Sequence, residues 1–247
     1  MTPEPASDNA TQPLGEVGRI TGVYFDPKKA FADIAARPTW IVPVILMILL
    51  AVAFTYTYST KIGWDRYFHQ IADTNSRMQQ MDAATRETAI QQQIKFGPIF
   101  GYIFSVIGIP ISVLIIGGVL LGVGKMGGAS LTFKQMRAIV SYGMLPSLIS
   151  SILAIIVMFL KNPEDFNLQN PLAFNLGAFL EPPPNTGKFL YAFAKSFDLF
   201  TIWMILLMAV GISVAAKKVS LSKAIILVAV PWLLWTLISS GAAGLFG

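Results

Sequence analysis

The chain has 247 residues, of which 54% are hydrophobic and 13% charged. Its mean hydropathy of +0.62 is far above that of an ordinary soluble domain. The net charge of +5 comes from basic residues dispersed among the loops, which argues against a nucleic-acid-binding protein. Because there is no cysteine, disulfides and thiolate metal sites are excluded.

Continuous apolar stretches dominate the sequence and predict helices that span a membrane. Each is long enough to cross a hydrocarbon core of about 30 Å at about 1.5 Å per residue, the fourth only just. Because the apolar runs are continuous rather than alternating, barrel strands are excluded. We predict an all-α, polytopic integral membrane protein with five transmembrane helices and a short amphipathic N-terminal helix. The predicted spans cover residues of about 40–60, 97–124, 138–160, 198–216 and 224–245.

The charges of the short loops predict the orientation. The turn between the second and third spans holds Lys125, Lys134 and Arg137 and no acidic residue, which is typical of a cytoplasmic loop. We therefore predict a cytoplasmic N-terminus and an external C-terminus. The first residues lack the apolar core of a cleavable signal peptide, so we expect none.

The N-terminal region divides into a polar tail and a helix. Residues 1–16 are expected to be a disordered cytoplasmic tail, and residues 17–247 the membrane domain. Asp26 is a candidate N-cap and Pro27 the first residue of a helix over residues 27–36. Its apolar residues, Phe31 among them, share one face. A short basic amphipathic helix of this kind usually lies in the membrane interface. The alternative is a lead-in packed under the bundle.

The first span begins after Pro38, with Trp40 at the position of an aromatic-belt residue. The external segment that follows, residues 61–95, predicts one or two amphipathic helices, broken near residues 73–76. It contains the only histidine, His69, which is too little for a metal site, so we expect no bound metal.

The second span is rich in glycine. Gly97 and Gly101, and again Gly118 and Gly122, have the four-residue spacing of helices that approach closely. Pro110 should kink this span.

Hydroxyl side chains in the third and fifth spans allow two interpretations. They usually bond to their own helix or to a neighbour, which is our main expectation. The alternative is a polar path through the bundle, formed by Ser141, Tyr142, Ser147, Ser150, Thr236 and Ser239.

The second external segment contains residues 166–180, an apolar and charge-free run that is too short to span. We predict that it folds back over the bundle as a re-entrant, interfacial or lid segment, with Phe174 and Phe179 buried. Asp198, at the start of the fourth span, should cap that helix and face Lys195.

Motifs of catalysis are absent from the sequence. It contains no metalloprotease helix, no phosphate-binding loop and no dinucleotide fingerprint. None of the spans carries a histidine or a mid-membrane ionisable residue, which serine proteases and proton-coupled transporters need. We therefore expect no enzyme activity and no cofactor.

A family resemblance rests on four short motifs in a fixed order. The sequence is similar to bacterial members of the YIP (Ypt/Rab-interacting protein) family over residues 20–240. The motif residues are Phe25, Asp26, Pro27 and Phe31 in the N-terminal helix, Pro38 and Trp40 before the first span, Tyr142 and Pro146 in the third, and Asp198 and Trp203 in the fourth.

The resemblance implies five spans, a cytoplasmic N-terminus and the bacterial cytoplasmic membrane. Eukaryotic relatives associate with Rab GTPases and act in membrane shaping, but their Asp-Leu-Tyr-Gly-Pro motif is missing here, which speaks against a Rab-type partner. We expect a non-enzymatic protein of membrane organisation or protein interaction, with lipid, other membrane proteins or a second copy as partners. The alternative is a small permease or channel subunit.

Overall fold

The computed structural model describes residues 13–183 and 185–246 of the chain, and the described part is a bundle of helices. This confirms the all-α prediction. The helices are α1 (Glu16–Phe25), α2 (Pro27–Ala36), α3 (Ile41–Lys61), α4 (Asp65–Thr74), α5 (Ser76–Gln79), α6 (Ala83–Ile103), α7 (Ile109–Met126), α8 (Phe133–Gly143), α9 (Pro146–Leu160), α10 (Lys188–Ser196), α11 (Leu199–Ala215) and α12 (Leu221–Phe246). Shorter elements are the π-helix Phe104–Gly108 and the 3₁₀ turns Pro163–Asp165 and Leu176–Phe179.

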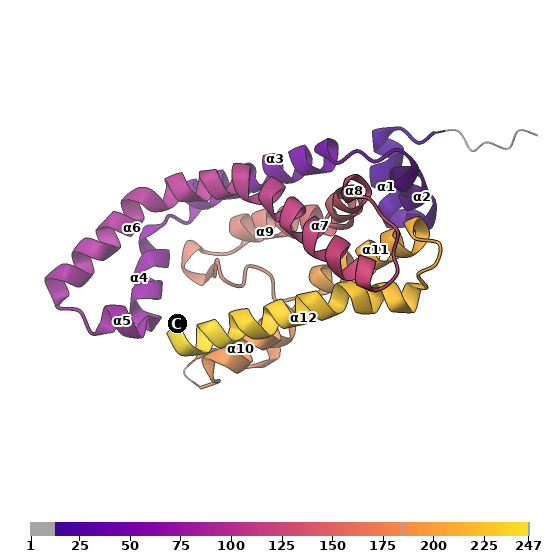
Figure 1. The fold of residues 1–247 in the computed structure, drawn as a ribbon. Coiled ribbons are helices and arrows are strands. Elements are labelled where there is room, and N and C mark those ends of the chain that lie inside the picture. Colours follow the sequence, from indigo (N-terminus) through magenta and orange to yellow (C-terminus); the bar gives the residue numbers. More distant parts are fainter. Residues whose placement is uncertain (1–12, 184, 247) are drawn as a thin grey trace, which may run out of the picture.

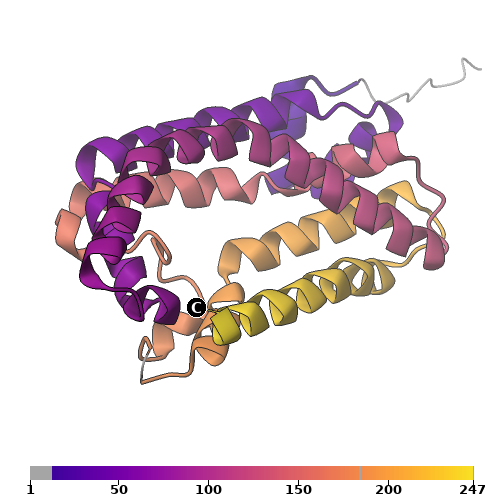
Figure 2. The ribbon, with the colours of Figure 1, turned by 60° about the vertical axis from the view of Figure 1, so that its left-hand side comes forward.

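Helices occupy all five apolar stretches of the sequence. Within the described residues, four helical segments are long and apolar enough to cross a membrane: Ile41–Lys61, Ala83–Met126, Phe133–Leu160 and Leu221–Leu245. The fifth, α11, is apolar but has only 17 residues. These segments run alternately between two ends of the molecule (Figures 1 and 2). We call them the cap end, where α1 and α2 lie, and the far end, where α4, α5, α10 and the C-terminus lie.

The second spanning segment is one long helix, from Ala83 to Met126. It begins well before the predicted span because residues 83–96 continue the same helix. The break predicted near residues 73–76 is confirmed, since Asn75 separates α4 from α5. A π-helix, Phe104–Gly108, interrupts the long helix just before Pro110. The proline has no N–H to donate, so an irregular turn is expected there. Figure 1 shows the helix arching between α6 and α7.

The glycine prediction is right for one pair and wrong for the other. A Cβ at Gly101 would lie 3.2 Å from Thr55 Cγ2, and one at Gly97 would overlap the ring of Phe68, so both glycines permit close packing. Gly118 and Gly122 have nothing within 4 Å of such a Cβ. The buried stripe of α7 runs instead through Val113, Gly117, Leu120 and Gly124, so the predicted pair faces outward.

The apolar face of the amphipathic helix α2 packs against protein. Its apolar residues Ala30, Phe31 and Ile34 are fully buried, and the helix contacts α11 and α8. This burial agrees with the predicted packing under the bundle, and the interfacial placement of α2 stays a prediction. The core continues from this face through α8 and α11, with Met136, Ile139, Val140, Leu145 and Ile212 among its buried residues.

The segment 166–180 folds back toward the bundle, but the predicted burial of Phe174 and Phe179 is wrong. Phe174 is 51% exposed and Phe179 is 87% exposed. Asn175 forms an isolated antiparallel β-bridge with Asp198. Because side chains alternate along an extended chain, burial of Asn175 turns Phe174 outward. Phe166 is buried instead, in a cluster with Tyr58 and Met158.

Candidate functional site

A network of polar side chains joins helices α1 and α2, which together we call the cap, to the rest of the bundle. Arg19 is only 4% exposed. Its Nε donates to Asp33 Oδ2 over 2.7 Å, and its guanidinium also donates to Thr39 Oγ1 over 2.8 Å. The hydroxyl of Tyr142, in α8, donates to Glu16 of α1. These five residues connect α1, α2 and the residues just before α3 to α8. We call them the polar staple: Glu16, Arg19, Asp33, Thr39 and Tyr142.

The staple gives the buried Arg19 the partners that a charge needs away from water. An ionised group in a low-dielectric interior is costly unless it is paired and hydrogen-bonded. Asp33 supplies the opposite charge and also pairs with Arg37. Glu16 accepts a second hydrogen bond from Thr39, over 3.1 Å. The cap is thus fixed to the bundle by a satisfied polar network as well as by its apolar face.

Most of the motif residues in the cap serve its folding. Asp26 caps α2, since its Oδ1 accepts from the Lys29 N–H over 3.3 Å, and Pro27 is the first helical residue, as predicted. Phe31 is fully buried. Its ring lies so close to α11 that a Cβ at Gly211 would be 2.9 Å from it.

Two aromatic motif residues also lie between the cap and the bundle. The guanidinium of Arg137 lies over the ring of Trp40, 5.0 Å from the centroid of that ring. Trp203 meets the ring of Tyr24 edge to face, with centroids 5.6 Å apart. The Tyr24 hydroxyl donates to the carbonyl of Leu145 over 2.8 Å, and burial raises the pKa of Tyr24 to about 12.

The prolines of the motifs lie where the chain changes direction. Pro146 is the first residue of α9, after the break that separates it from α8. Pro38 lies in the short connection between α2 and α3. Both are positions where a missing N–H costs little.

One residue of the first motif has no evident structural role. Phe25 is 88% exposed at the junction of α1 and α2, and the side chains of Lys28 and Lys29, close to it in sequence, are exposed as well. An exposed aromatic residue beside two basic residues is a combination typical of contact with a membrane surface. We call these three residues the exposed triad.

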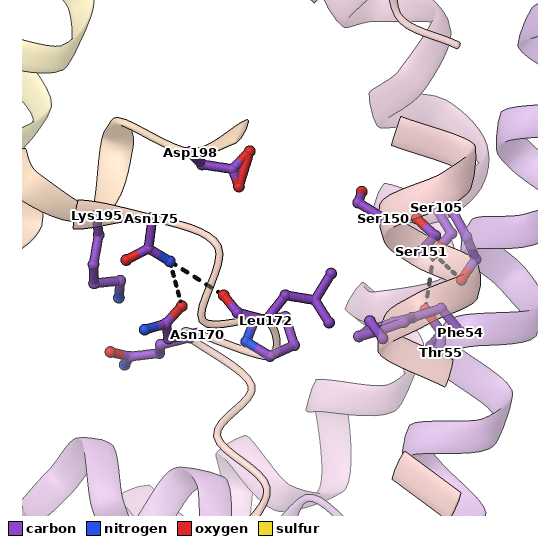
Figure 3. Close-up of a pocket in the computed structure, with 14 residues that line it drawn as sticks. Phe54, Thr55, Ser105, Ser150, Ser151, Asn170, Leu172, Asn175, Lys195 and Asp198 are labelled. Carbon is purple, nitrogen blue, oxygen red and sulfur yellow. Dashed lines mark hydrogen bonds between the residues drawn. The ribbon is translucent and has the colours of Figure 1, made fainter. Parts of the chain in front are cut away.

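A second polar site lies toward the far end. An open cavity of about 400 Å³ is lined by α3, α9, the π-helix and the returning segment before α11. Figure 3 shows two groups of polar side chains facing each other across it. One wall carries the hydroxyls of Thr55, Ser105, Ser150 and Ser151, and the other carries Asn170, Asn175, Lys195 and Asp198.

The hydroxyl wall is held together by contacts between helices. Thr55 Oγ1 and Ser105 Oγ are 2.9 Å apart, and both side chains are buried. Ser105 lies in the π-helix and also donates to the carbonyl of Gly101 over 2.8 Å. Isolated π turns of this kind occur frequently at functional sites.

The opposite wall is fixed by the β-bridge. The Leu199 N–H donates to the carbonyl of Phe174 over 3.0 Å. Asp198 caps α11, as predicted, because its Oδ1 accepts from the Thr201 N–H over 2.9 Å. Lys195 and Asp198 line the same cavity, but among the described residues no carboxylate lies within 4.0 Å of Lys195. They do not form an ion pair.

The cavity contains groups that the sequence reasoning did not place together. Of the six residues of the predicted polar path, only Ser150 lines it. Ser141 donates to the carbonyl of Ala138 and Ser239 to that of Thr236, which agrees with bonding to the same helix. The unusual shortness of the fourth apolar stretch, with Lys195 and Asp198 before it, was the one available signal for the site.

Comparison with known proteins gives one match. Residues 21–243 match the family model of the Yip1 domain. No curated protein and no solved structure is significantly similar to the chain.

Proposed function

We propose that the chain, which belongs to the Yip1 family because that family's model matches residues 21–243, is a non-enzymatic membrane protein that organises the bilayer through its cap. The family and the apolar helices make it a multi-pass membrane protein. We further propose that the protein has five spans, that its cap end faces the cytoplasm and that it resides in the bacterial cytoplasmic membrane. Lys125 and Lys134, in the helical turns on either side of the connection between α7 and α8, support this orientation.

The exposed triad is the observation that carries the proposal. Most of the first motif is accounted for by folding, since Asp26 and Pro27 begin α2 and Phe31 fills the core. Phe25 and the two lysines after it remain exposed. A phenyl ring inserts readily between lipid headgroups, and lysines are attracted to an anionic leaflet. Because the polar staple fixes the cap to the bundle, such contact would act on the bilayer through a rigid body.

The test uses single cysteines in this cysteine-free chain. A spin label at Phe25→Cys, in the full chain in lipid discs, should become accessible to oxygen when the lipid is anionic. A label at Gln80→Cys, an exposed position after α5 at the far end, should stay in water and serves as the control. If position 25 is as water-accessible as position 80 in anionic discs, the cap does not bind the bilayer.

The orientation is tested with the same approach in whole cells. Asn185 and Ser130 are both exposed, near the far end and the cap end respectively. A membrane-impermeant thiol reagent should label Asn185→Cys from outside and Ser130→Cys only after the membrane is opened. The reverse pattern would contradict the proposed topology.

A small permease or channel subunit is the second candidate, and the polar cavity is the observation that favours it. The two candidate functions differ in whether they require the exposed triad. If the protein organises the bilayer, vesicles that contain it should cluster or change shape only when the triad is intact. If it is a permease or channel subunit, solute flux should not depend on the triad.

A further inference from the structure

The polar cavity lies well inside the ends of the spanning helices, at a depth where polar groups are costly. Thr55 precedes the end of α3 at Lys61 by six residues, or about 9 Å, and Ser150 precedes the end of α9 by ten, or about 15 Å. Asp198 faces them across the cavity (Figure 3). Helix α11, which starts after Asp198, is only about 25 Å long and does not cover a hydrocarbon core of about 30 Å.

The returning segment therefore brings irregular backbone and two ionisable side chains into the span of the bundle. Irregular backbone at such depth is tolerated where it lines a polar cavity. Ionisable residues there are costly and mark binding sites by default. Transporter and receptor sites in membranes are often built at interrupted helices of this kind.

Hydrogen bonds of an asparagine hold this wall of the cavity in place. Asn175 is 8% exposed and lines the cavity. Its Nδ2 donates to Asn170 Oδ1 over 2.7 Å and to the carbonyl of Leu172 over 3.2 Å. Its Oδ1 is buried, lies on the side of Gly177 and has no hydrogen-bond partner, so it is closed to a ligand in the cavity.

The charges on this wall are separate rather than paired. Lys195 is half-buried, with its ammonium 5.4 Å from the centroid of the Tyr191 ring. Asp198 uses Oδ1 to cap α11 and also lines the cavity. The wall thus offers one cation and, separately, one carboxylate. A ligand complementary to it carries an anionic group and an ammonium group.

We propose that the cavity binds a zwitterion made of a phosphate and a primary ammonium, the chemistry of a phosphoethanolamine headgroup. The phosphate accepts from Lys195 and from serine hydroxyls of the opposite wall, while the ammonium donates to Asp198. The volume of about 400 Å³ lies within the range of about 300–1,000 Å³ of small-molecule sites. This site is independent of the exposed triad.

The experiment measures binding of three probes to the full chain, delipidated in detergent. The probes are dioctanoyl-phosphatidylethanolamine, dioctanoyl-phosphatidylglycerol and water-soluble glycerophosphoethanolamine. Lys195→Gln should weaken binding of both lipids about tenfold or more, the size of one charge-assisted hydrogen bond. Asp198→Asn should weaken only the ethanolamine lipid, because asparagine still caps α11 and only the partner of the ammonium is altered.

Matched controls are Lys161→Gln and Glu181→Gln, which remove the same charges from exposed positions of the same external segment. Both should bind like the unmodified chain. Binding of glycerophosphoethanolamine as tightly as the diacyl form would support the site and assign it a soluble ligand; binding of the diacyl form alone would assign a lipid. Equal binding of both lipids to all four variants, or no binding of any probe, would overturn the proposal.

Discussion

Replacing Gly211 with alanine tests how closely α11 approaches α2 and α8. The added Cβ would lie 2.6 Å from Ile139 Cγ2 and 2.9 Å from Phe31 Cδ1. Both neighbouring side chains are fully buried, so neither can move into open space. Overpacking of this kind costs about 1–3 kcal/mol. Alanine also gains about 1 kcal/mol of helix propensity over glycine, which offsets part of that cost.

A second substitution isolates the packing contribution. Gly118→Ala makes the same chemical change in α7, where a Cβ meets nothing within 4 Å. Since the propensity gain is common to both variants, their difference in unfolding free energy should be about 1–3 kcal/mol. For a chain of this size, 1 kcal/mol corresponds to about 2–4 °C. The variant at 211 should therefore melt about 2–12 °C below the variant at 118.

The assay is thermal unfolding of both purified variants in the same detergent, followed by tryptophan fluorescence and circular dichroism. The reasoning requires the variant at 211 to be the less stable of the two. If it melts at the same temperature as the variant at 118, or higher, the close approach of α11 to Phe31 and Ile139 is wrong.

Two further predictions concern tyrosines of the cap contact. Tyr142→Phe removes the hydroxyl that donates to Glu16. It should lower the unfolding free energy by about 0.5–1.5 kcal/mol, because water can reach the partly exposed Glu16, whereas the exposed Tyr56→Phe should not change the melting temperature. Tyr24 has its pKa raised from 10.0 to about 12 by burial, so its contribution is complete below pH 10 and lost as the pH rises toward 12. Melting curves from pH 8 to 12 should therefore show a smaller alkaline loss for Tyr24→Phe, and an unchanged loss would contradict this assignment.

Local patterns made much of the fold predictable from the sequence. Asp26 and Pro27 show the start of α2, and the periodicity of its apolar residues identifies Phe31 as buried, because both signals depend only on neighbouring positions. The break before α9 at Pro146 is also a local event, although the third span was predicted as one continuous stretch. Such features do not require knowledge of which helices meet.

The remaining features depend on pairings between distant segments. The staple joins Glu16 to Tyr142, and no pattern near either residue shows that partner. Asn175 is buried because it bridges to Asp198. Phe174, its neighbour in the extended chain, therefore points outward and not inward as predicted. The cavity was likewise not predictable, because its walls come from four separate parts of the chain.

The π-helix has a consequence for how this chain tolerates insertions and deletions. A π turn accommodates one residue more than an α-helical turn of the same rise, so α6 and α7 follow two separate registers. Loss of a single residue within Phe104–Gly108 would restore a continuous α-helix and leave the two halves facing as they do now, because the extra residue is absorbed within the turn. Loss of a residue from the α-helical turns of α6 or α7 would instead rotate one half against the other by about 100°. The close contacts of Gly101 with Thr55 and of Gly117 with α8 would then not form together. Single-residue length changes in this helix are therefore expected to be tolerated at the π turn and not in the flanking helices.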